Sequence, residues 1–266
     1  MATPFQLESP PLFGLPTIHH RKSLMPRNSK KAVFFDFGDT VASTKPSYLV
    51  RVALAMRAAG YYISDRDFEL AYVKTDFKIY EKYKKQGQMT PQEYGEWFFP
   101  ILCGYLSLDG DPFAIRRKMR MELRDIKFAR NALPGAVELL EILKEKGFIL
   151  GIISNNDGST EGKCEEVGIR DYFDIIADST NLGLIKPDSR IFHFVLDKLK
   201  LSPSQAIHVG DLYGSDVMGG LNAGLDVVWL NQSEIERPDI GQVATVKHLS
   251  EIKTILEIEK MGSDHA

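Results

Sequence analysis

Ten residues near the start of the chain, Ala32 to Val41, read AVFFDFGDTV and indicate how the protein folds. An apolar run ends abruptly in Asp36, and Gly38, Asp39 and Thr40 follow it closely. A short apolar run that stops at polar residues and glycine is typical of a buried β-strand reaching the edge of a sheet. We therefore expect a strand that delivers the carboxylate of Asp36 to a surface where chemistry can occur.

The later part of the chain alternates short apolar runs with helical segments. Strands rich in Val, Ile or Phe are predicted over residues 32–36, 148–154, 174–177, 206–210 and 226–230. A helix is predicted from Gly135 to Lys146, opened by Pro134 and closed by Gly147. Such alternation predicts an α/β fold, a doubly wound parallel sheet with helices on its faces.

Residues 44–130 follow another pattern, with several helix starts and no convincing strand. Ser64 precedes one predicted helix, Thr90-Pro91-Gln92-Glu93 is a capping box with proline just inside, and Asp111-Pro112 is a third start. An all-helical block inserted after the first strand predicts a helical cap over the sheet. The predicted core is then formed by residues 31–43 and 131–260.

The first 30 residues contain five prolines among scattered polar residues and end in a basic stretch. This composition predicts a flexible N-terminal extension. An organelle-targeting or partner-binding tail is the alternative interpretation, but the segment has no clear amphipathic helix.

Composition indicates which broad classes of protein to exclude. The formal net charge is −3 and the pI is about 6.1, so no global charge favours nucleic acid or an anionic membrane as a partner. The two cysteines, Cys103 and Cys164, lie far apart, which fits free thiols in a reducing compartment. No apolar stretch approaches the ~20 residues of a membrane span. We expect a cytoplasmic protein, and its oligomeric state is not indicated.

Ligands of an open parallel sheet bind beyond the carboxyl ends of the strands, so the residues that follow each predicted strand are the candidates for a site. They are Asp36 after the first strand, Ser154 and Asn155 after the second, Lys186 after the third, and Asp211 and Asp216 after the fourth. Taken singly, each also has a structural interpretation as a cap or turn residue. Their joint order at one rim carries the functional hypothesis.

This set of side chains fits phosphoryl transfer. A carboxylate such as Asp36 can attack phosphorus and form an aspartyl-phosphate that water then hydrolyses. Because an anion attacks an anion, positive charge is needed nearby. Magnesium held by carboxylates, together with a lysine and a hydroxyl, supplies it. Asp211, Lys186 and Ser154 fit those needs.

The same elements resemble the haloacid dehalogenase superfamily of hydrolases. The first motif of that family is Asp-x-Asp-x-Thr/Val after a strand, here VFFDFGDTV, and the second is Ser154 in GIISNN. The third is Lys186 in GLIKPDSRIF, and the fourth is Gly210-Asp211 with Asp216. The resemblance covers residues 32 to about 258, and it implies a Rossmann-like core with the helical cap between the first two motifs.

The resemblance also implies an activity and roles for these residues. Most relatives with this layout are magnesium-dependent phosphatases of small phosphorylated metabolites. Asp36 is then the nucleophile and a metal ligand, Ser154 and Lys186 bind the phosphate, and Asn155 bonds the phosphate or substrate. Asp211, Asp216 and the backbone carbonyl of Gly38 complete the predicted metal site.

Gly38 departs from the family pattern, because phosphatases of the family place a second aspartate there as the general acid. Glycine keeps the backbone carbonyl and loses the acid. Asp39 is one residue late, and on an extended strand its side chain points away from the leaving group. We therefore expect Asp39 to be a turn or cap residue.

Two alternatives to a phosphatase follow from Gly38. One is a hydrolase of another bond, the carbon–phosphorus bond of phosphonates first, since that branch carries a small residue at this position. The other is a catalytically weak member that binds a phosphorylated ligand or a partner protein. Dehalogenases need no metal, so the retained Asp211 and Asp216 disfavour that reaction.

Overall fold

The computed structural model describes residues 30–237 and 243–257. The predicted N-terminal extension lies outside the described residues except for Lys30, and so do residues 258–260 of the predicted core.

A six-stranded parallel sheet lies at the centre of the fold, in the order β5-β4-β1-β6-β7-β8. Its strands are β1 (Ala32–Phe35), β4 (Ile149–Ser154), β5 (Ile175–Asp178), β6 (Ala206–Gly210), β7 (Asp226–Leu230) and β8 (Val243–Val246). The predicted doubly wound sheet is confirmed, although β8 was not predicted. Because β1 pairs with both β4 and β6, the ends of these three strands meet at the point where the strand order reverses.

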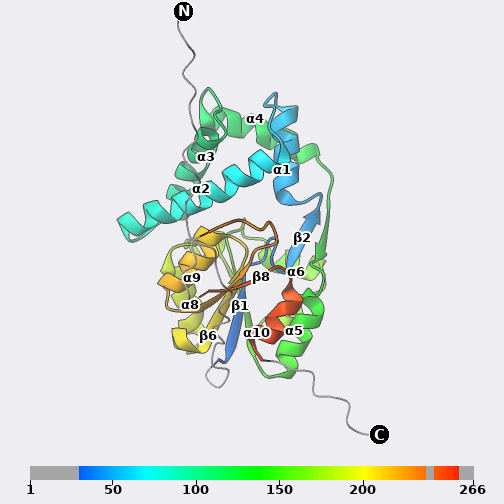
Figure 1. Ribbon diagram of the computed structural model, residues 1–266, viewed down its shortest axis with the longest axis vertical. Coiled ribbons are helices and arrows are strands. Elements are labelled where there is room, and N and C mark those ends of the chain that lie inside the picture. Colours follow the sequence, from blue (N-terminus) through cyan, green and yellow to red (C-terminus); the bar gives the residue numbers. More distant parts are fainter. Residues whose placement is uncertain (1–29, 238–242, 258–266) are drawn as a thin grey trace, which may run out of the picture.

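Helices cover both faces of this sheet (Figure 1). They are α5 (Ala136–Glu145), α6 (Thr160–Glu166), α7 (Ser179–Leu182), α8 (Ser189–Leu199), α9 (Gly219–Asn222) and α10 (Ile252–Ile255), with the π-helix η4 (Tyr213–Met218) before α9 and three short 3-10 turns, η2 (Arg170–Tyr172), η3 (Pro203–Gln205) and η5 (Leu249–Glu251). The helix predicted from Gly135 therefore begins at Ala136 and ends one residue before Lys146.

The apolar run of β1 is continuous because both of its faces are buried. Val33 and Phe35 pack in the cluster that contains the apolar side of α5, whereas Ala32 and Phe34 pack in the cluster that contains α8. Alternation along a strand thus sends successive side chains into two hydrophobic layers. This arrangement fixes the strand that ends at Asp36 in the middle of the core.

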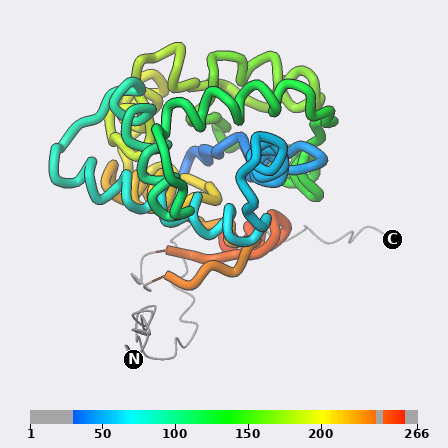
Figure 2. The backbone as a smooth tube through the Cα atoms, turned by 90° about the horizontal axis from the view of Figure 1, so that it is seen from above, coloured from blue at the N-terminus to red at the C-terminus, as the bar shows by residue number. Residues whose placement is uncertain are grey.

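Four helices occupy the chain between β2 and β3 and lie over one end of the sheet (Figures 1 and 2). They are α1 (Tyr48–Ala58), α2 (Asp65–Gln86), α3 (Pro91–Tyr105) and α4 (Pro112–Asp125). The predicted helix starts are confirmed, because Ser64, Thr90 and Asp111 each accept hydrogen bonds from the first turn. We refer to residues 46–128 as the helical insertion, which has a hydrophobic cluster of its own.

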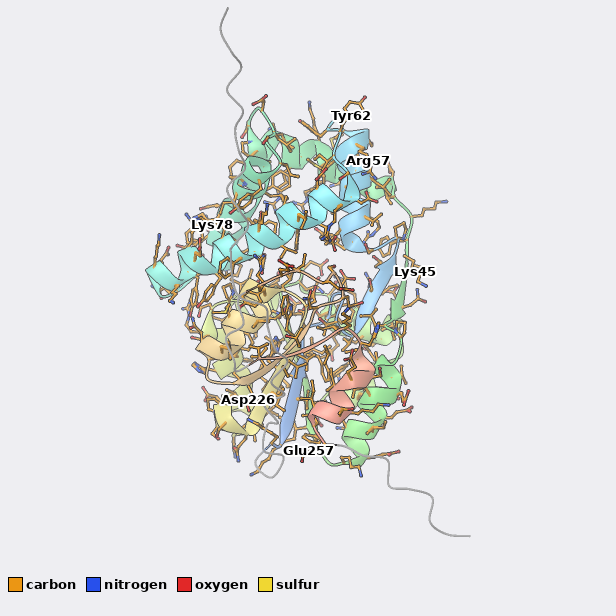
Figure 3. The ribbon with its side chains drawn as sticks, in the orientation of Figure 1. Lys45, Arg57, Tyr62, Lys78, Asp226 and Glu257 are labelled. Carbon is orange, nitrogen blue, oxygen red and sulfur yellow. The ribbon has the colours of Figure 1, made fainter. Side chains whose placement is uncertain are left out.

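A two-stranded antiparallel ribbon joins the helical insertion to the core. It pairs β2 (Ala42–Lys45) with β3 (Ala129–Ala132), and Lys45 marks its end toward the helices (Figure 3). No strand is predicted from the sequence within residues 44–130, whereas these two strands overlap both ends of that interval. Neither strand has an apolar run, and β3 is half exposed, so its pattern gives no strand signal.

Among the residues that the structure describes, no helix combines the length and apolar character that crossing a lipid bilayer requires.

Candidate active site

Asp36 follows β1 directly and is almost fully buried, with 8 % of its surface exposed. Its backbone N–H donates to the carbonyl of Val209 at 2.8 Å, so the parallel pairing of β1 with β6 continues to this residue. Its Oδ1 accepts a hydrogen bond from Lys186 Nζ at 2.7 Å. The predicted strand therefore carries this carboxylate to the sheet edge and into contact with the predicted lysine.

Lys186 connects two of the predicted acids. Its ammonium group donates to Asp36 at 2.7 Å and to Asp216 Oδ1 at 2.6 Å, and the side chain is buried. Burial alone would lower the pKa of Lys186, but the charges of Asp216 and Asp36 raise it above its ordinary value. Lys186 is therefore a fixed cation between two carboxylates.

Asp211 and Asp216 come from the segment after β6. Gly210 has no side chain where a Cβ would lie 2.2 Å from Cγ of Asp216, so glycine permits this carboxylate to fold back against the strand end. Asp216 Oδ2 then accepts the N–H of Leu212 at 3.0 Å. Thr40 Oγ1 donates to Asp211 Oδ1 at 3.3 Å, and Trp229 Nε1 donates to the Asp211 carbonyl at 2.9 Å.

His208 supports the site from within β6. Its ring nitrogen Nε2 lies 3.0 Å from Asp216 Oδ1, and burial lowers its pKa, which favours the neutral ring. The ring also packs edge-on against Phe192, with centroids 5.0 Å apart. His208 is therefore a packed, hydrogen-bonded core histidine.

The three carboxylates differ in their affinity for protons. Burial raises the pKa of Asp36 to about 6 against the attraction of Lys186. Burial, followed by the charges of Asp216 and Asp36, raises the pKa of Asp211 well above its ordinary value. Burial also opposes ionisation of Asp216, but the ammonium of Lys186 and the hydrogen bond with His208 bring its pKa down to about 2. Ionisation of all three carboxylates would leave more negative charge than one lysine compensates.

These residues suit a magnesium ion. Asp36, Asp211 and Asp216 each offer a carboxylate oxygen, and the three oxygens lie within 4.8 Å of one another. Three carboxylates facing one ammonium leave an excess of negative charge that a divalent cation would neutralise. Carboxylate and carbonyl oxygens are the ligands that Mg²⁺ prefers. The donor set therefore fits the magnesium ion predicted from the sequence.

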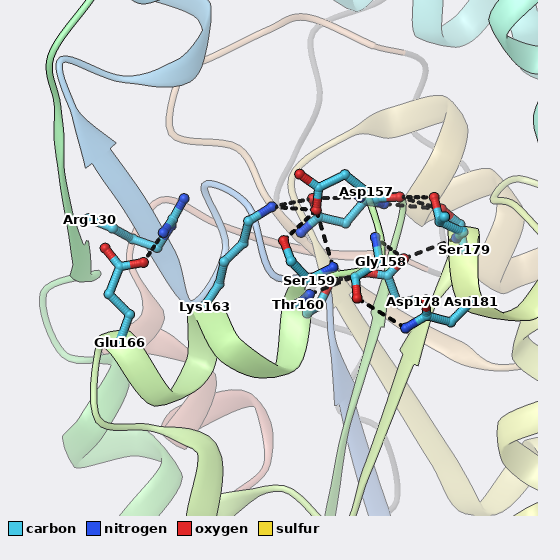
Figure 4. A network of polar contacts seen from close by, with 12 residues as sticks. Arg130, Asp157, Gly158, Ser159, Thr160, Lys163, Glu166, Asp178, Ser179 and Asn181 are labelled. Carbon is cyan, nitrogen blue, oxygen red and sulfur yellow. Dashed lines mark hydrogen bonds and ion pairs between the residues drawn. The ribbon is translucent and has the colours of Figure 1, made fainter. Parts of the chain in front are cut away.

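The loop after β4 is fixed by a polar network that includes Asp178, the last residue of β5 (Figure 4). The carboxylate of Asp178 accepts the N–H groups of Gly158, Thr160 and Thr180 at 3.0, 3.2 and 3.0 Å. Ser154, buried at the end of β4, begins this loop. The parallel pairing of β4 with β1 places the predicted phosphate-binding serine at the same sheet edge as Asp36.

Asn155 contacts the backbone of Lys186 on both sides. Its Oδ1 accepts the Lys186 N–H at 2.8 Å and its Nδ2 donates to the Lys186 carbonyl at 2.9 Å. These bonds tie the loop after β4 to the loop that carries the lysine. The prediction that Asn155 binds phosphate or substrate stays a prediction, and the structure adds this positioning contact.

Gly38 and Asp39 form a turn and not an extended stretch. Asp39 has a φ of 51°, in the left-handed region, and its carboxylate accepts a hydrogen bond from Ser43 Oγ. Its N–H donates to the Ala42 carbonyl at 2.8 Å. Asp39 is therefore a turn residue, as expected. The turn, and not alternation along an extended strand, directs its carboxylate to Ser43.

The chain is similar to known proteins over the part that contains this site. A sequence model of the haloacid dehalogenase-like hydrolases matches residues 30–224, which include every predicted site residue. The chain is a haloacid dehalogenase-like hydrolase. Of its relatives, the glyceraldehyde 3-phosphate phosphatase of Methanothermobacter thermautotrophicus is 29% identical over 85% of this chain and 99% of that protein.

A second relative matches a shorter part of the hydrolase. The pyrimidine 5'-nucleotidase YjjG of Escherichia coli is 39% identical over 47% of this chain and 56% of that protein. Among solved structures, the HAD-hydrolase YfnB of Bacillus subtilis bound to magnesium covers 87% of this chain and 100% of its own, with a TM-score of 0.59 and 24% identity. That likeness shows the shared fold.

Sequence reasoning missed a buried acid in the helical insertion of the hydrolase. Asp76 lies on α2 in the helical insertion, is fully buried, and accepts hydrogen bonds from Gly214 and Ser215, next to Asp216. Within a polar helix, an aspartate predicts a solvated face. Only the packing of α2 on η4 distinguishes Asp76 from the exposed acids Asp65 and Asp67.

Proposed function

We propose that this hydrolase is a magnesium-dependent phosphatase of a small phosphorylated metabolite, with Asp36 as its nucleophile. One observation carries the proposal: Lys186 bridges Asp36 and Asp216, with Asp211 beside them, at the end of the central strands. A buried carboxylate held by a fixed cation next to further metal-binding acids is what in-line attack on a phosphate needs.

In the first step, a carboxylate oxygen of Asp36 attacks phosphorus and the bond to the leaving oxygen breaks, which gives an aspartyl-phosphate. Lys186 stabilises the negative charge of the phosphoryl oxygens, and the Ser154 hydroxyl donates a hydrogen bond to them. Asp36, Asp211, Asp216 and the Gly38 carbonyl would hold Mg²⁺, which supplies positive charge to the phosphoryl group when bound.

In the second step, water attacks phosphorus, phosphate leaves and the Asp36 carboxylate is restored. Gly38 provides no group to protonate the leaving oxygen or to activate this water. Loss of a general acid or base typically costs about 10²–10⁴ in rate. We infer that phosphates with good leaving groups are turned over best, because they depend least on protonation.

The helical insertion acts as a cap in this proposal. Its helices lie over the sheet end that carries Asp36, and closure of such a cover excludes water and adds contacts to the substrate (Figure 1). The named activities of the relatives, on glyceraldehyde 3-phosphate and on pyrimidine nucleotides, support a small phosphorylated substrate.

Gly38 favours a second candidate function. Without a general acid, the same residues bind a phosphorylated ligand yet release product slowly, or cleave another bond such as that of a phosphonate. The space at Gly38 is open, because a Cβ there would lie 4.0 Å from its nearest neighbour, Asp36 Oδ2. Apart from Asp36 and the two chain neighbours of Gly38, no described residue has a heavy atom within 4 Å of that Cβ position.

A panel of phosphorylated metabolites, aryl phosphates and phosphonates tests the proposal. Phosphate release is measured with Mg²⁺, with excess chelator, and with Mg²⁺ restored. We expect release that stops in chelator and recovers with Mg²⁺. Full activity in chelator would overturn the phosphatase proposal, and tight binding of phosphate esters without release would support the second candidate.

A further inference from the structure

Asp76 is a buried acid of the helical insertion that the proposed reaction does not use. It lies near the middle of α2, has no exposed surface, and comes from the helical insertion and not from the core. In the described part of the chain, no lysine, arginine or histidine forms an ion pair with it. A buried carboxylate that forms no ion pair needs hydrogen-bond donors, since burial of an unpaired charge is costly.

The donors come from the first turn of η4. Gly214 N–H donates to Asp76 Oδ2 at 2.6 Å, and Ser215 donates to Oδ1 through its N–H at 3.0 Å and its hydroxyl at 2.5 Å. These backbone groups lie at the start of a helical segment, where N–H groups lack partners within the helix. Asp76 therefore caps η4 from a different part of the molecule.

Close packing accompanies these hydrogen bonds. A Cβ at Gly214 would lie 2.5 Å from the Asp76 carbonyl oxygen, so only glycine allows α2 to approach this closely. Next to the contact, the Phe77 and Tyr213 rings pack with centroids 5.8 Å apart. The helical insertion and η4 therefore fit together as one interface around Asp76.

The capped segment also carries metal-binding acids. Asp216 directly follows Ser215, and Asp211 lies three residues before Gly214. Asp216 turns its own carboxylate to the Leu212 N–H, so it shares this short segment with the groups that Asp76 holds. Movement of the segment would change the separation of the carboxylates of Asp36, Asp211 and Asp216.

We propose that Asp76 is a positioning residue that places the Asp211 and Asp216 carboxylates for metal binding when the helical insertion is seated on the core. The inference rests on the proposed function, which gives these two acids their metal-binding role. It links two properties that would otherwise be independent: the position of the insertion, which covers the substrate, and the shape of the metal site. When the insertion moves away, η4 loses three hydrogen bonds at once.

The variant Asp76→Asn tests this link, because it keeps the size of the side chain but replaces one carboxylate oxygen by an NH₂ group. This group cannot accept a hydrogen bond from the N–H groups of η4. The matched control is Asp65→Asn, the same change on the exposed first turn of the same helix. Ser215→Ala is a milder variant that removes only the hydroxyl donor. Three quantities are measured for each: amide hydrogen exchange in residues 212–218, Mg²⁺ affinity by calorimetry, and kinetic constants on an aryl phosphate.

We expect Asp76→Asn to speed exchange in residues 212–218 and to weaken Mg²⁺ binding by about tenfold, since N–H groups of η4 lose a buried acceptor. The value of kcat falls while KM stays nearly unchanged, Ser215→Ala shows a smaller shift in the same direction, and Asp65→Asn behaves as wild type. Wild-type exchange and Mg²⁺ affinity in a folded Asp76→Asn, or in Ser215→Ala if Asp76→Asn does not fold, would overturn the inference. Hydrogen exchange and calorimetry test the positioning role of Asp76 even if the wild type releases no phosphate. A lack of phosphate release would contradict the proposed function and leave the test of Asp76 intact.

Discussion

Lys186 Nζ lies 2.7 Å from Asp36 Oδ1, across 150 positions of sequence, and both side chains are largely buried. The same nitrogen lies 2.6 Å from Asp216. One lysine therefore holds the proposed nucleophile and a proposed metal ligand together. Its removal would leave two buried carboxylates facing each other.

Lys186→Met tests that relationship. Because breaking a buried ion pair leaves an uncompensated charge, we expect the free energy of unfolding at neutral pH to fall by about 3–5 kcal/mol. We also expect the pKa of Asp36 to rise above its present value of about 6, and phosphatase activity to be lost. Urea denaturation measures the first effect, with the exposed Lys85→Met as control. Wild-type activity in a folded Lys186→Met would contradict the assignment of the lysine.

Gly38→Asp restores the carboxylate that the family's phosphatases carry. The site has room for it, because the nearest neighbour of a Cβ is 4.0 Å away. We expect turnover of alkyl phosphates to rise, by up to about 10² if the new group acts as general acid, and turnover of aryl phosphates to rise much less. Steady-state kinetics on the two substrate classes measures this. An equal change on both classes would argue against a missing general acid.

Asp39→Asn tests whether Asp39, one residue after Gly38, acts as the general acid. Its carboxylate is directed to Ser43 and its backbone is in a left-handed turn, so we expect kcat to change by less than about threefold. Asp36→Asn, measured alongside, is expected to abolish activity. If the two variants are equally inactive and both remain folded, Asp39 is the general acid and our interpretation of the turn is wrong.

Asp76 predicts a pH-dependent contribution to stability. Burial raises the pKa of Asp76 to about 6. Hydrogen bonds from Ser215 and Gly214 oppose this increase, whereas the charge of Asp216 adds to it. The positive charge of Arg237 attracts the Asp76 carboxylate. A pKa above the unfolded value means that the folded protein binds the proton more tightly. The stabilisation is therefore complete below about pH 4 and is lost as the pH rises through about 6.

The measurement compares wild type with Asp76→Asn in urea at pH 5 and pH 7.5. Because the pKa of Asp76 is about 6, the free energy of unfolding of the wild type should fall by about 1 kcal/mol relative to that of Asp76→Asn between pH 5 and pH 7.5. Other acids titrate in both proteins and cancel in the comparison. A difference that grows with pH would show that Asp76 is held as a stabilised carboxylate in this range.

The fold and the motif residues could be predicted because their signals are local. The run that ends in Asp36 encodes a strand buried on both faces, and Asp211 and Asp216 follow another such strand. The contacts between distant segments could not be predicted. Asp76 reaches Ser215 across 139 positions, and only tertiary packing distinguishes it from a solvated acid. A turn role for Asp39 was predicted, but its left-handed backbone was not, because the preceding strand suggested continued extension.

The central claim, that Asp36 accepts the phosphoryl group and that Gly38 slows its release, is tested most directly by trapping the intermediate. The protein is mixed with an aryl phosphate and Mg²⁺, quenched in acid within milliseconds, digested and examined by mass spectrometry. The account predicts a phosphoryl group on Asp36 in the wild type, a smaller trapped fraction in Gly38→Asp, and none in Asp36→Asn. Rapid phosphate release with no phosphoryl group on Asp36, or with the group on another residue, would contradict it.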